Sequence, residues 1–461
     1  MSPDALGGSF RDPSGFVYER DGVLLRQVNP AGARHYDALM QSGVYAHLTE
    51  RGWLVAHEEV ASPPDAGASR TLRPERIPYV SYPYEWCFDQ LRDAARLTLD
   101  IQLACLERGV TLRDASAFNV QFVGRRPVFI DTLSFETYRD GVPWVAYRQY
   151  CQHFLAPLAL MSHVDRRLRQ LLVHHLDGIP LDLASRVLPG RTRLRYGLLA
   201  HVHLHAASQR RHQGAAAGSA PVRIPTLPKA RLVALLHSLR AAVDGCRPPG
   251  GATEWGDYYQ DTNYSESAMQ AKLAIVAGMV DAVIQPGDTI HDLGANTGRF
   301  SRLVSGPGRY VVAHDVDDLA VERHYRALHA DGHDGVLPLL LDLTNPSPAL
   351  GWAHDERRAA MDRLAGGTVL ALALVHHLAI SNNVPLDRLA GFFARIAPRL
   401  VVEFVPKEDS QVRRLLATRE DVFPDYTVDA FEAALARHYV IERREAVPES
   451  SRTLFAARRR R

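Results

Sequence analysis

The chain has 461 residues, of which 46% are hydrophobic and 23% charged, and its formal net charge is +2. This size favours at least two domains, and the near-neutral charge gives no reason to expect a nucleic-acid partner. Because no apolar run approaches the roughly eighteen residues of a membrane span, and the N-terminus lacks the features of a signal peptide, we expect a soluble, cytoplasmic protein.

The cysteines at positions 87, 105, 151 and 246 lie far apart, and none belongs to a Cys-x-x-Cys pair. This spacing argues against a structural zinc site and against a disulfide framework. We therefore expect no metal ligands among the cysteines, and a reducing compartment.

Residues 1–160 predict an α+β domain. Residues 15–29 alternate in the manner of a β-hairpin, with Asp21-Gly22 as the turn. A sequence pattern typical of helices follows at 35–54. Residues 83–136 predict a long amphipathic helix, a loop and a short hairpin that ends in an acid.

The loop and acid of this region carry a spacing known from phosphotransferases. Arg113-Asp114, Asn119 and Asp131 resemble the catalytic loop and metal-binding acid of protein-kinase-like domains, a resemblance that implies a magnesium nucleotide site. The chain has no glycine-rich loop and no Val-Ala-Ile-Lys strand, and Arg26 is the nearest cation. The resemblance therefore implies a degenerate domain without phosphoryl transfer. The alternative is that these residues only shape turns.

Residues 161–250 predict a helical connector. A small and proline-rich stretch at 212–228 and another at 244–256 flank a helix predicted over 229–243. We expect both stretches to be linkers.

Residues 251–461 alternate strand-like and helix-like runs, which predicts a doubly wound α/β sheet. The seven strands are expected at 288–294, 309–315, 335–342, 367–375, 398–405, 438–447 and 451–458. Since the last two are joined by too few residues for a helical crossover, they should form an antiparallel hairpin at the edge of an otherwise parallel sheet.

The first of these strands leads into the loop "HDLGANTG", which ends the strand at Asp292. Gly294 allows a tight turn, and Gly298 lets the next helix pack against the strand. A dinucleotide fingerprint would have glycine where Asn296 stands, and the carboxylate of Asp292 would repel a pyrophosphate. The loop favours a cationic ligand that carries an amino group.

Two further acids end the second and third strands. Asp315 is spaced to accept both hydroxyls of a ribose, with Asp317 as a second choice, and Asp342 is placed to contact an adenine edge. The alternative for each acid is a helix cap or a turn, the commonest role of Asp after a strand.

The acid-x-Gly-x-x-x-Gly pattern of Asp292, Gly294 and Gly298 resembles that of the class I S-adenosylmethionine-dependent methyltransferases. The resemblance implies a Rossmann-like domain and S-adenosyl-L-methionine as the cofactor. Asp292 and the loop with Gly294, Asn296 and Gly298 would then serve its methionine moiety. By the same resemblance, the acids that end the second and third strands would serve its ribose and adenine.

Groups on either side of this pattern are candidates for catalysis. His376 or His377, after the fourth strand, could be a general base for the acceptor, or could pack beside the cofactor. Tyr258, Tyr259 and Tyr264, ahead of the first strand, could face a sulfonium or pack between domains. An Asn-Pro-Pro-aromatic motif is absent, which favours methylation of an oxygen, a carbon or another nucleophile over an amide or adenine nitrogen.

The whole chain also resembles the bacterial family of NoeA-type nodulation proteins and their uncharacterised methyltransferase relatives. The stretches that carry this resemblance include "SYPYEWCFDQLRDAA", "LRDASAFNVQF", "PVFIDTLSFE" and "FVPKEDSQVRRLLATREDVFPDY". We expect a methyltransferase whose acceptor is a small molecule, a carbohydrate or a protein, with an N-terminal domain that recognises the substrate or a partner. A non-catalytic cofactor-binding scaffold and a bifunctional kinase-methyltransferase remain open.

Overall fold

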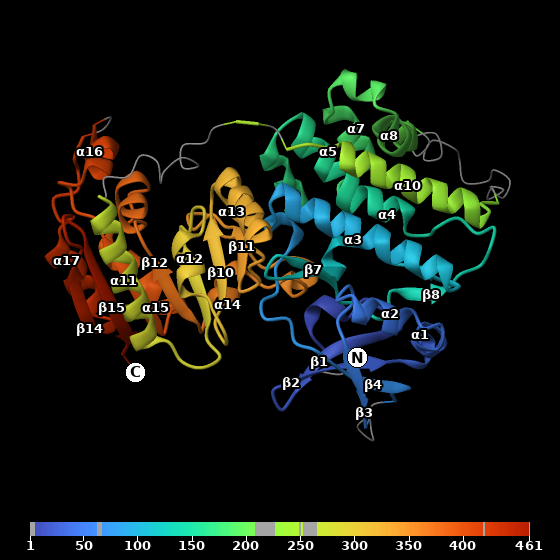
Figure 1. The fold of residues 1–461 in the computed structure, drawn as a ribbon, viewed down its shortest axis with the longest axis horizontal. Coiled ribbons are helices and arrows are strands. Elements are labelled where there is room, and N and C mark those ends of the chain that lie inside the picture. The colour runs from blue at the N-terminus through green and yellow to red at the C-terminus, as the bar shows by residue number, and fades with distance from the viewer. Residues whose placement is uncertain are drawn as a thin grey trace. The chain divides into compact units, whose positions relative to one another are not determined.

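The computed structural model describes residues 5–61, 67–207, 226–248, 250–251, 265–417 and 420–460. The chain forms two compact units (Figure 1). The first unit comprises Met1–Gly250 and Ala349–Arg357, and the second comprises Gly251–Pro348 and Arg358–Arg461. The expected connector at 161–250 is thus part of the same unit as residues 1–160.

The first unit opens with a four-stranded antiparallel sheet in the order β1-β2-β4-β3. Its strands are β1 (Gly15–Arg20), β2 (Val23–Val28), β3 (His57–Val60) and β4 (Arg70–Pro74). The hairpin predicted between β1 and β2 is confirmed: Arg20 pairs with Val23, and Asp21 and Gly22 turn the chain with φ of 51° and 76°. Such left-handed values suit the Asp-Gly dipeptide.

The rest of the first unit is mainly helical. The long helix expected after residue 83 is α3 (Phe88–Glu107), whose apolar face is buried. Arg96 and Asp100 on α3 form ion pairs with Asp244 and Arg240 of α10 (Lys229–Gly245), which ties the last helix of this unit to α3. The residues from 161 on therefore pack with the N-terminal residues instead of forming a separate connector.

The remaining elements of the first unit are two short antiparallel ladders and several short helices. The ladders are β5–β8 and β6–β7. Their strands are β5 (Val110–Leu112), β6 (Val120–Val123), β7 (Arg126–Phe129) and β8 (Phe135–Thr137). The helices are α1 (Pro30–Gln41), α2 (Val44–Glu50), α4 (Tyr147–Tyr150), α5 (Ala156–His163), α6 (Leu171–His174), α7 (Leu181–Val187) and α8 (Tyr196–Leu198).

A segment from the C-terminal half, Ala349–Arg357, belongs to the first unit. Glu356 pairs with Arg11, and the guanidinium of Arg357 lies 4.3 Å from the centroid of the Phe118 ring. The prediction that 251–461 forms one uninterrupted domain is wrong for these nine residues, because their partners come from the N-terminal part of the chain.

The second unit contains a seven-stranded sheet in the order β11-β10-β9-β12-β13-β15-β14. Its strands are β9 (Thr289–Leu293), β10 (Tyr310–Asp315), β11 (Val336–Leu340), β12 (Thr368–Ala371), β13 (Arg399–Phe404), β14 (Tyr439–Ala446) and β15 (Thr453–Arg459). The first five pair in parallel, whereas β15 is antiparallel to both β13 and β14. All seven predicted strands and the edge hairpin are confirmed.

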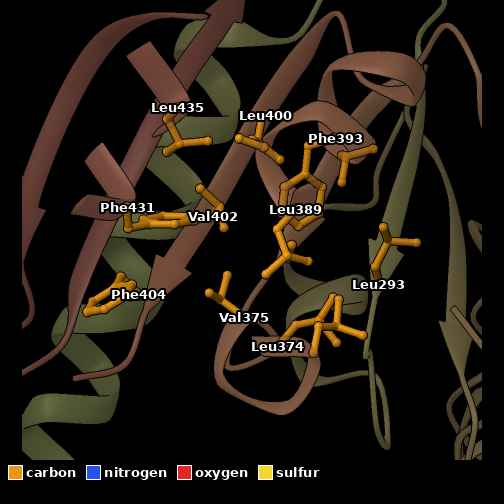
Figure 2. Close-up of a cluster of buried hydrophobic side chains, with 14 of the residues drawn as sticks. Leu293, Leu374, Val375, Leu389, Phe393, Leu400, Val402, Phe404, Phe431 and Leu435 are labelled. Carbon is orange, nitrogen blue, oxygen red and sulfur yellow. The ribbon is translucent and has the colours of Figure 1, made fainter. Parts of the chain in front are cut away.

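Helices cover both faces of this sheet. Successive side chains of a strand point to opposite faces, so the apolar residues of these parallel strands need a partner on each side. On β13, Leu400, Val402 and Phe404 join a core with α15 (Leu386–Ile396) and α17 (Val428–Ala436), part of which Figure 2 shows. Val401 points to the other core, with α11 (Glu266–Val283) and α12 (Arg299–Val304).

Among the described residues, the second unit also contains the α-helices α13 (Asp318–Asp331), α14 (Ala360–Leu364) and α16 (Ser410–Leu416). The helix α11 begins after Ser265, whose hydroxyl caps it by accepting a hydrogen bond from the main-chain N–H of Ala268. In the described part of the chain, no helix is both long and apolar enough to cross a membrane.

Candidate functional site

A cavity of about 240 Å³ opens in the second unit where β9, β10, β11 and β12 end. The carboxyl ends of parallel strands are where open α/β sheets bind ligands. Among the residues that line it are five of the six expected to contact a cofactor: Asp292, Gly294, Asn296, Asp315 and Asp342.

The loop after β9 is built from left-handed residues. Gly294, Asn296 and Gly298 have φ of 78°, 50° and 75°, and asparagine tolerates this region better than most residues. A Cβ added at Gly298 would lie 1.9 Å from a ring atom of His324 on α13. The close neighbour that requires glycine there is thus a side chain of α13, and not the strand that the sequence suggested.

Asp315, at the end of β10, ties this loop to the sheet. Its Oδ2 accepts the main-chain N–H of Asn296 at 2.7 Å, and its Oδ1 accepts that of Asp317 at 2.8 Å. Asp317 itself caps α13 by accepting the N–H groups of Leu319 and Ala320, so it has the structural role. Since a carboxylate has about four acceptor sites, Asp315 keeps acceptor capacity beyond its main-chain donors.

The two buried acids of the cavity have perturbed acidities. Burial raises the pKa of Asp292 to about 7, although a hydrogen bond from the hydroxyl of Ser301 at 2.6 Å favours the charged form. Burial likewise raises the pKa of Asp315 to about 6, although hydrogen bonds from the main-chain N–H groups of Asp317, Asn296 and Val316 favour the charged form. Because burial makes both acids costly to ionise, a cationic ligand would stabilise their ionised forms.

The third acid, Asp342, is exposed at the cavity rim. Its Oδ1 accepts the main-chain N–H of Thr344 at 2.8 Å and the Thr344 hydroxyl at 2.6 Å. This is the turn-forming role considered as the alternative, combined with a place on the cavity wall.

The two candidate histidines occupy different environments, although their rings are 4.0 Å apart. His377 lines the cavity, and burial lowers its pKa to about 4. His376 is fully buried, does not line the cavity, and finds no hydrogen-bond partner among the described residues. The geometry gives only His377 access to a ligand.

Sequence reasoning missed two cations in the cavity wall, Lys272 on α11 and Arg452 before β15. Lys272 Nζ lies 2.7 Å from Oε2 of Glu403, and Arg452 Nε lies 2.8 Å from Oδ2 of Asp409. A lysine inside the apolar run "AMQAKLAIVAGMV", in a chain with three lysines, was the available signal for the first.

The first unit brings together the residues of the phosphotransferase-like pattern. Arg26 on β2 forms an ion pair with Asp131, and Ser134 links Asp131 to Asn119 by hydrogen bonds. Asp114 accepts the main-chain N–H of Ser116 and the side-chain amides of Gln149 and Asn119. Burial favours the neutral form of Asp131, but the charge of Arg26 holds the pKa of Asp131 below its ordinary value.

Among the described residues, no group of three or more His, Cys, Asp or Glu side chains is arranged to hold a metal ion. Tyr258, Tyr259 and Tyr264 lie outside the described residues, so their expected place near a ligand stays a prediction.

Comparison with known proteins gives one relative over the full length. Nodulation protein NoeA of Rhizobium meliloti (strain 1021) is 36% identical over 466 residues, which cover 99% of this chain and 96% of that protein. No family model matches the chain.

Solved structures resemble the chain only distantly. The N-methyltransferase NodS of Bradyrhizobium japonicum WM9 with S-adenosyl-L-homocysteine is 10% identical, with a TM-score of 0.32, over 46% of this chain and 94% of that one. Magnesium protoporphyrin IX methyltransferase of Synechocystis PCC 6803 with the same ligand is 15% identical, with a TM-score of 0.31, over 45% and 93%. Likeness at such TM-scores does not support an inference of function.

Proposed function

The chain belongs to the family of nodulation protein NoeA, and from the chemistry of its cavity we propose that it is an S-adenosylmethionine-dependent methyltransferase. The observation that carries this proposal is the pair of buried acids, Asp292 and Asp315, that end neighbouring strands beside a left-handed glycine loop. A ligand with positive charge and vicinal hydroxyls would satisfy both acids.

The residues present fit this cofactor group by group. Asp315 is our candidate for the ribose hydroxyls, because a carboxylate keeps acceptor capacity beyond the main-chain donors that it already binds. Asp292 and Lys272, an acid and a cation in one cavity, suit the ammonium and carboxylate of an amino acid. Asp342 at the rim is our candidate for the adenine edge. The same acids would repel the pyrophosphate of a dinucleotide.

When bound, S-adenosylmethionine supplies a methyl group on a positively charged sulfur, already activated for transfer. The chain's own task is to align the acceptor, to exclude water and, for a hydroxyl acceptor, to take up its proton. We assign the proton acceptor to an imidazole nitrogen of His377, which burial keeps neutral at neutral pH.

The first unit, in this proposal, recognises the acceptor or a partner and does not transfer phosphate. Phosphoryl transfer depends on metal ions and cations placed around the triphosphate. Asp131 is instead neutralised by Arg26, and Asp114 is engaged by Ser116 and Gln149. The acceptor class, whether small molecule, carbohydrate or protein, is left to experiment.

The test is titration of the purified chain with S-adenosylmethionine and S-adenosylhomocysteine, followed by incubation with labelled S-adenosylmethionine and cell extract. Saturable binding together with transfer of label supports the methyltransferase. Binding without transfer to any fraction would instead indicate a scaffold, and absence of binding would refute the proposal.

A further inference from the structure

Glu403, near the end of β13, is fully buried and does not line the cavity, yet it contacts three residues that do. Its Oε2 lies 2.7 Å from Nζ of Lys272 and accepts the main-chain N–H of Ala373 at 2.8 Å. Nη1 of Arg452 is 3.9 Å from its Oε1. These three partners come from α11, from the segment after β12 and from the loop between β14 and β15.

Two of these partners, Ala373 and Lys272, need support for their position. Ala373 has a φ of 49°, and this left-handed conformation is unfavourable for any residue that carries a Cβ atom. The hydrogen bond to Glu403 offsets that cost. Lys272 carries its charge in a buried place, 5.1 Å from the centroid of the Phe300 ring at the start of α12. One carboxylate therefore fixes a strained main chain and a buried cation on the same wall.

Stability alone does not account for such a pair. A buried ion pair can often be replaced by apolar side chains of similar volume without loss of stability, since desolvation cancels most of the attraction. What an apolar pair cannot do is hold an ammonium group at the cavity wall. We therefore look for the function of Glu403 in the contact between Lys272 and the ligand.

We propose that Glu403 is a positioning residue of the cavity, which acts through Lys272 and Ala373 on the amino-acid end of the bound cofactor. This inference rests on the proposed function. Lys272 and Asp292 line the same cavity. Burial raises the pKa of Asp292, and the positive charge of Lys272 acts in the opposite direction. A zwitterionic amino-acid group pairs its ammonium with the acid and its carboxylate with the cation.

The experiment compares two ligands in a double variant, Lys272→Met with Glu403→Gln, in the full chain. The glutamine retains an acceptor for the N–H of Ala373, and methionine fills the space of the lysine stem, so that no buried charge is left alone. The ligands are S-adenosylhomocysteine and 5′-methylthioadenosine, which keeps the nucleoside and lacks the amino-acid group.

We expect the double variant to bind S-adenosylhomocysteine about tenfold or more weakly, as for loss of a charged hydrogen bond, with 5′-methylthioadenosine unchanged. The matched control is the ion pair between Arg399, the first residue of β13, and Asp288, which directly precedes β9. The two side chains are 12% and 11% exposed, and neither lines the cavity. Its neutral version, Arg399→Met with Asp288→Asn, should leave both affinities unchanged.

If the double variant binds S-adenosylhomocysteine as tightly as the wild type, or binds both ligands more weakly by the same factor, this inference is overturned and the proposed function is not. No binding by the wild type would overturn the proposed function and this inference with it. Should the double variant not fold, Lys272→Met gives a second measurement, because Glu403 can then take up a proton and stay neutral. The same selective loss is expected there.

Discussion

The main-chain N–H of Asn296 donates to Oδ2 of Asp315 at 2.7 Å, which fastens the loop after β9 to the end of β10. The acid assigned to the ribose therefore also shapes the loop assigned to the methionine moiety. On the proposed assignment, this carboxylate couples cofactor binding to the geometry of the loop, so changes at either place should affect the other.

Gly298 tests the geometry of the loop. Gly298→Ala should destabilise the chain by roughly 2 kcal/mol or more, because a left-handed backbone and a collision with the His324 ring act together. Gly308→Ala is the matched control, since Gly308 has a similar φ of 73° and open space around its Cβ position. Chemical denaturation of both variants measures the difference, and equal losses would argue against the close approach of His324.

Cofactor binding should depend on pH. Because burial raises the pKa of Asp292 to about 7 and that of Asp315 to about 6, the cavity takes up protons when empty. A cationic ligand favours the ionised acids, so the affinity for S-adenosylmethionine should rise between about pH 5 and 8, with release of protons. Titration in buffers of different ionisation enthalpy measures this release, and an affinity independent of pH would contradict it.

The same shifts fix the sign of the effect on stability. The pKa of Asp292 is higher in the folded chain than its ordinary value of 3.8, so the folded state binds more protons across this window. The free energy of unfolding should therefore fall as pH rises from about 4 to 7. Asp292→Asn should flatten that slope in denaturant titrations of the empty protein.

His377→Ala should lower turnover about a hundredfold while cofactor affinity stays near normal, if His377 takes the acceptor's proton. His376→Ala serves as the comparison: the residue is fully buried beside it and does not line the cavity, so its loss should reduce stability more than turnover. Full turnover in the His377 variant, or loss of cofactor binding there, would make that residue a packing group.

We expect that the first unit does not transfer phosphate, and the Asp131→Asn variant tests this expectation. The change leaves Arg26 without its carboxylate partner, so we expect a loss of about 3 kcal/mol in stability, with methyl transfer to a small test acceptor largely kept. Labelled ATP incubated with the wild type provides the direct measurement. Phosphate release that Asp131→Asn abolishes would show a working kinase instead.

The sequence was sufficient to predict the sheet of the second unit, because each strand is a short apolar run bounded by turn residues. The edge hairpin followed from the short connection between β14 and β15. The division into units was harder, since Glu356 and Arg357 find partners in residues far back along the chain. No local pattern encodes such pairing.

The site shows the same limit. Asp292 and Asp315 were recognisable because both end predicted strands, and position in a parallel sheet brings strand ends together. Lys272 and Arg452 reach the cavity from a helix and from a loop near the C-terminus, so only the folded chain brings them to the acids. The environments of His376 and His377 likewise depend on packing that adjacent positions do not reveal.

The most direct test of the central claim is calorimetric titration of S-adenosylhomocysteine into the wild type and into Asp315→Ala, with NAD as the second ligand. We predict saturable binding of S-adenosylhomocysteine to the wild type and none of NAD. In Asp315→Ala the binding should weaken by about 1.5–3 kcal/mol, the value of hydrogen bonds to a charged group, whereas Asp317→Asn, which keeps the helix cap, should bind normally. Unchanged affinity in Asp315→Ala, or binding of NAD in place of S-adenosylhomocysteine, would contradict the account.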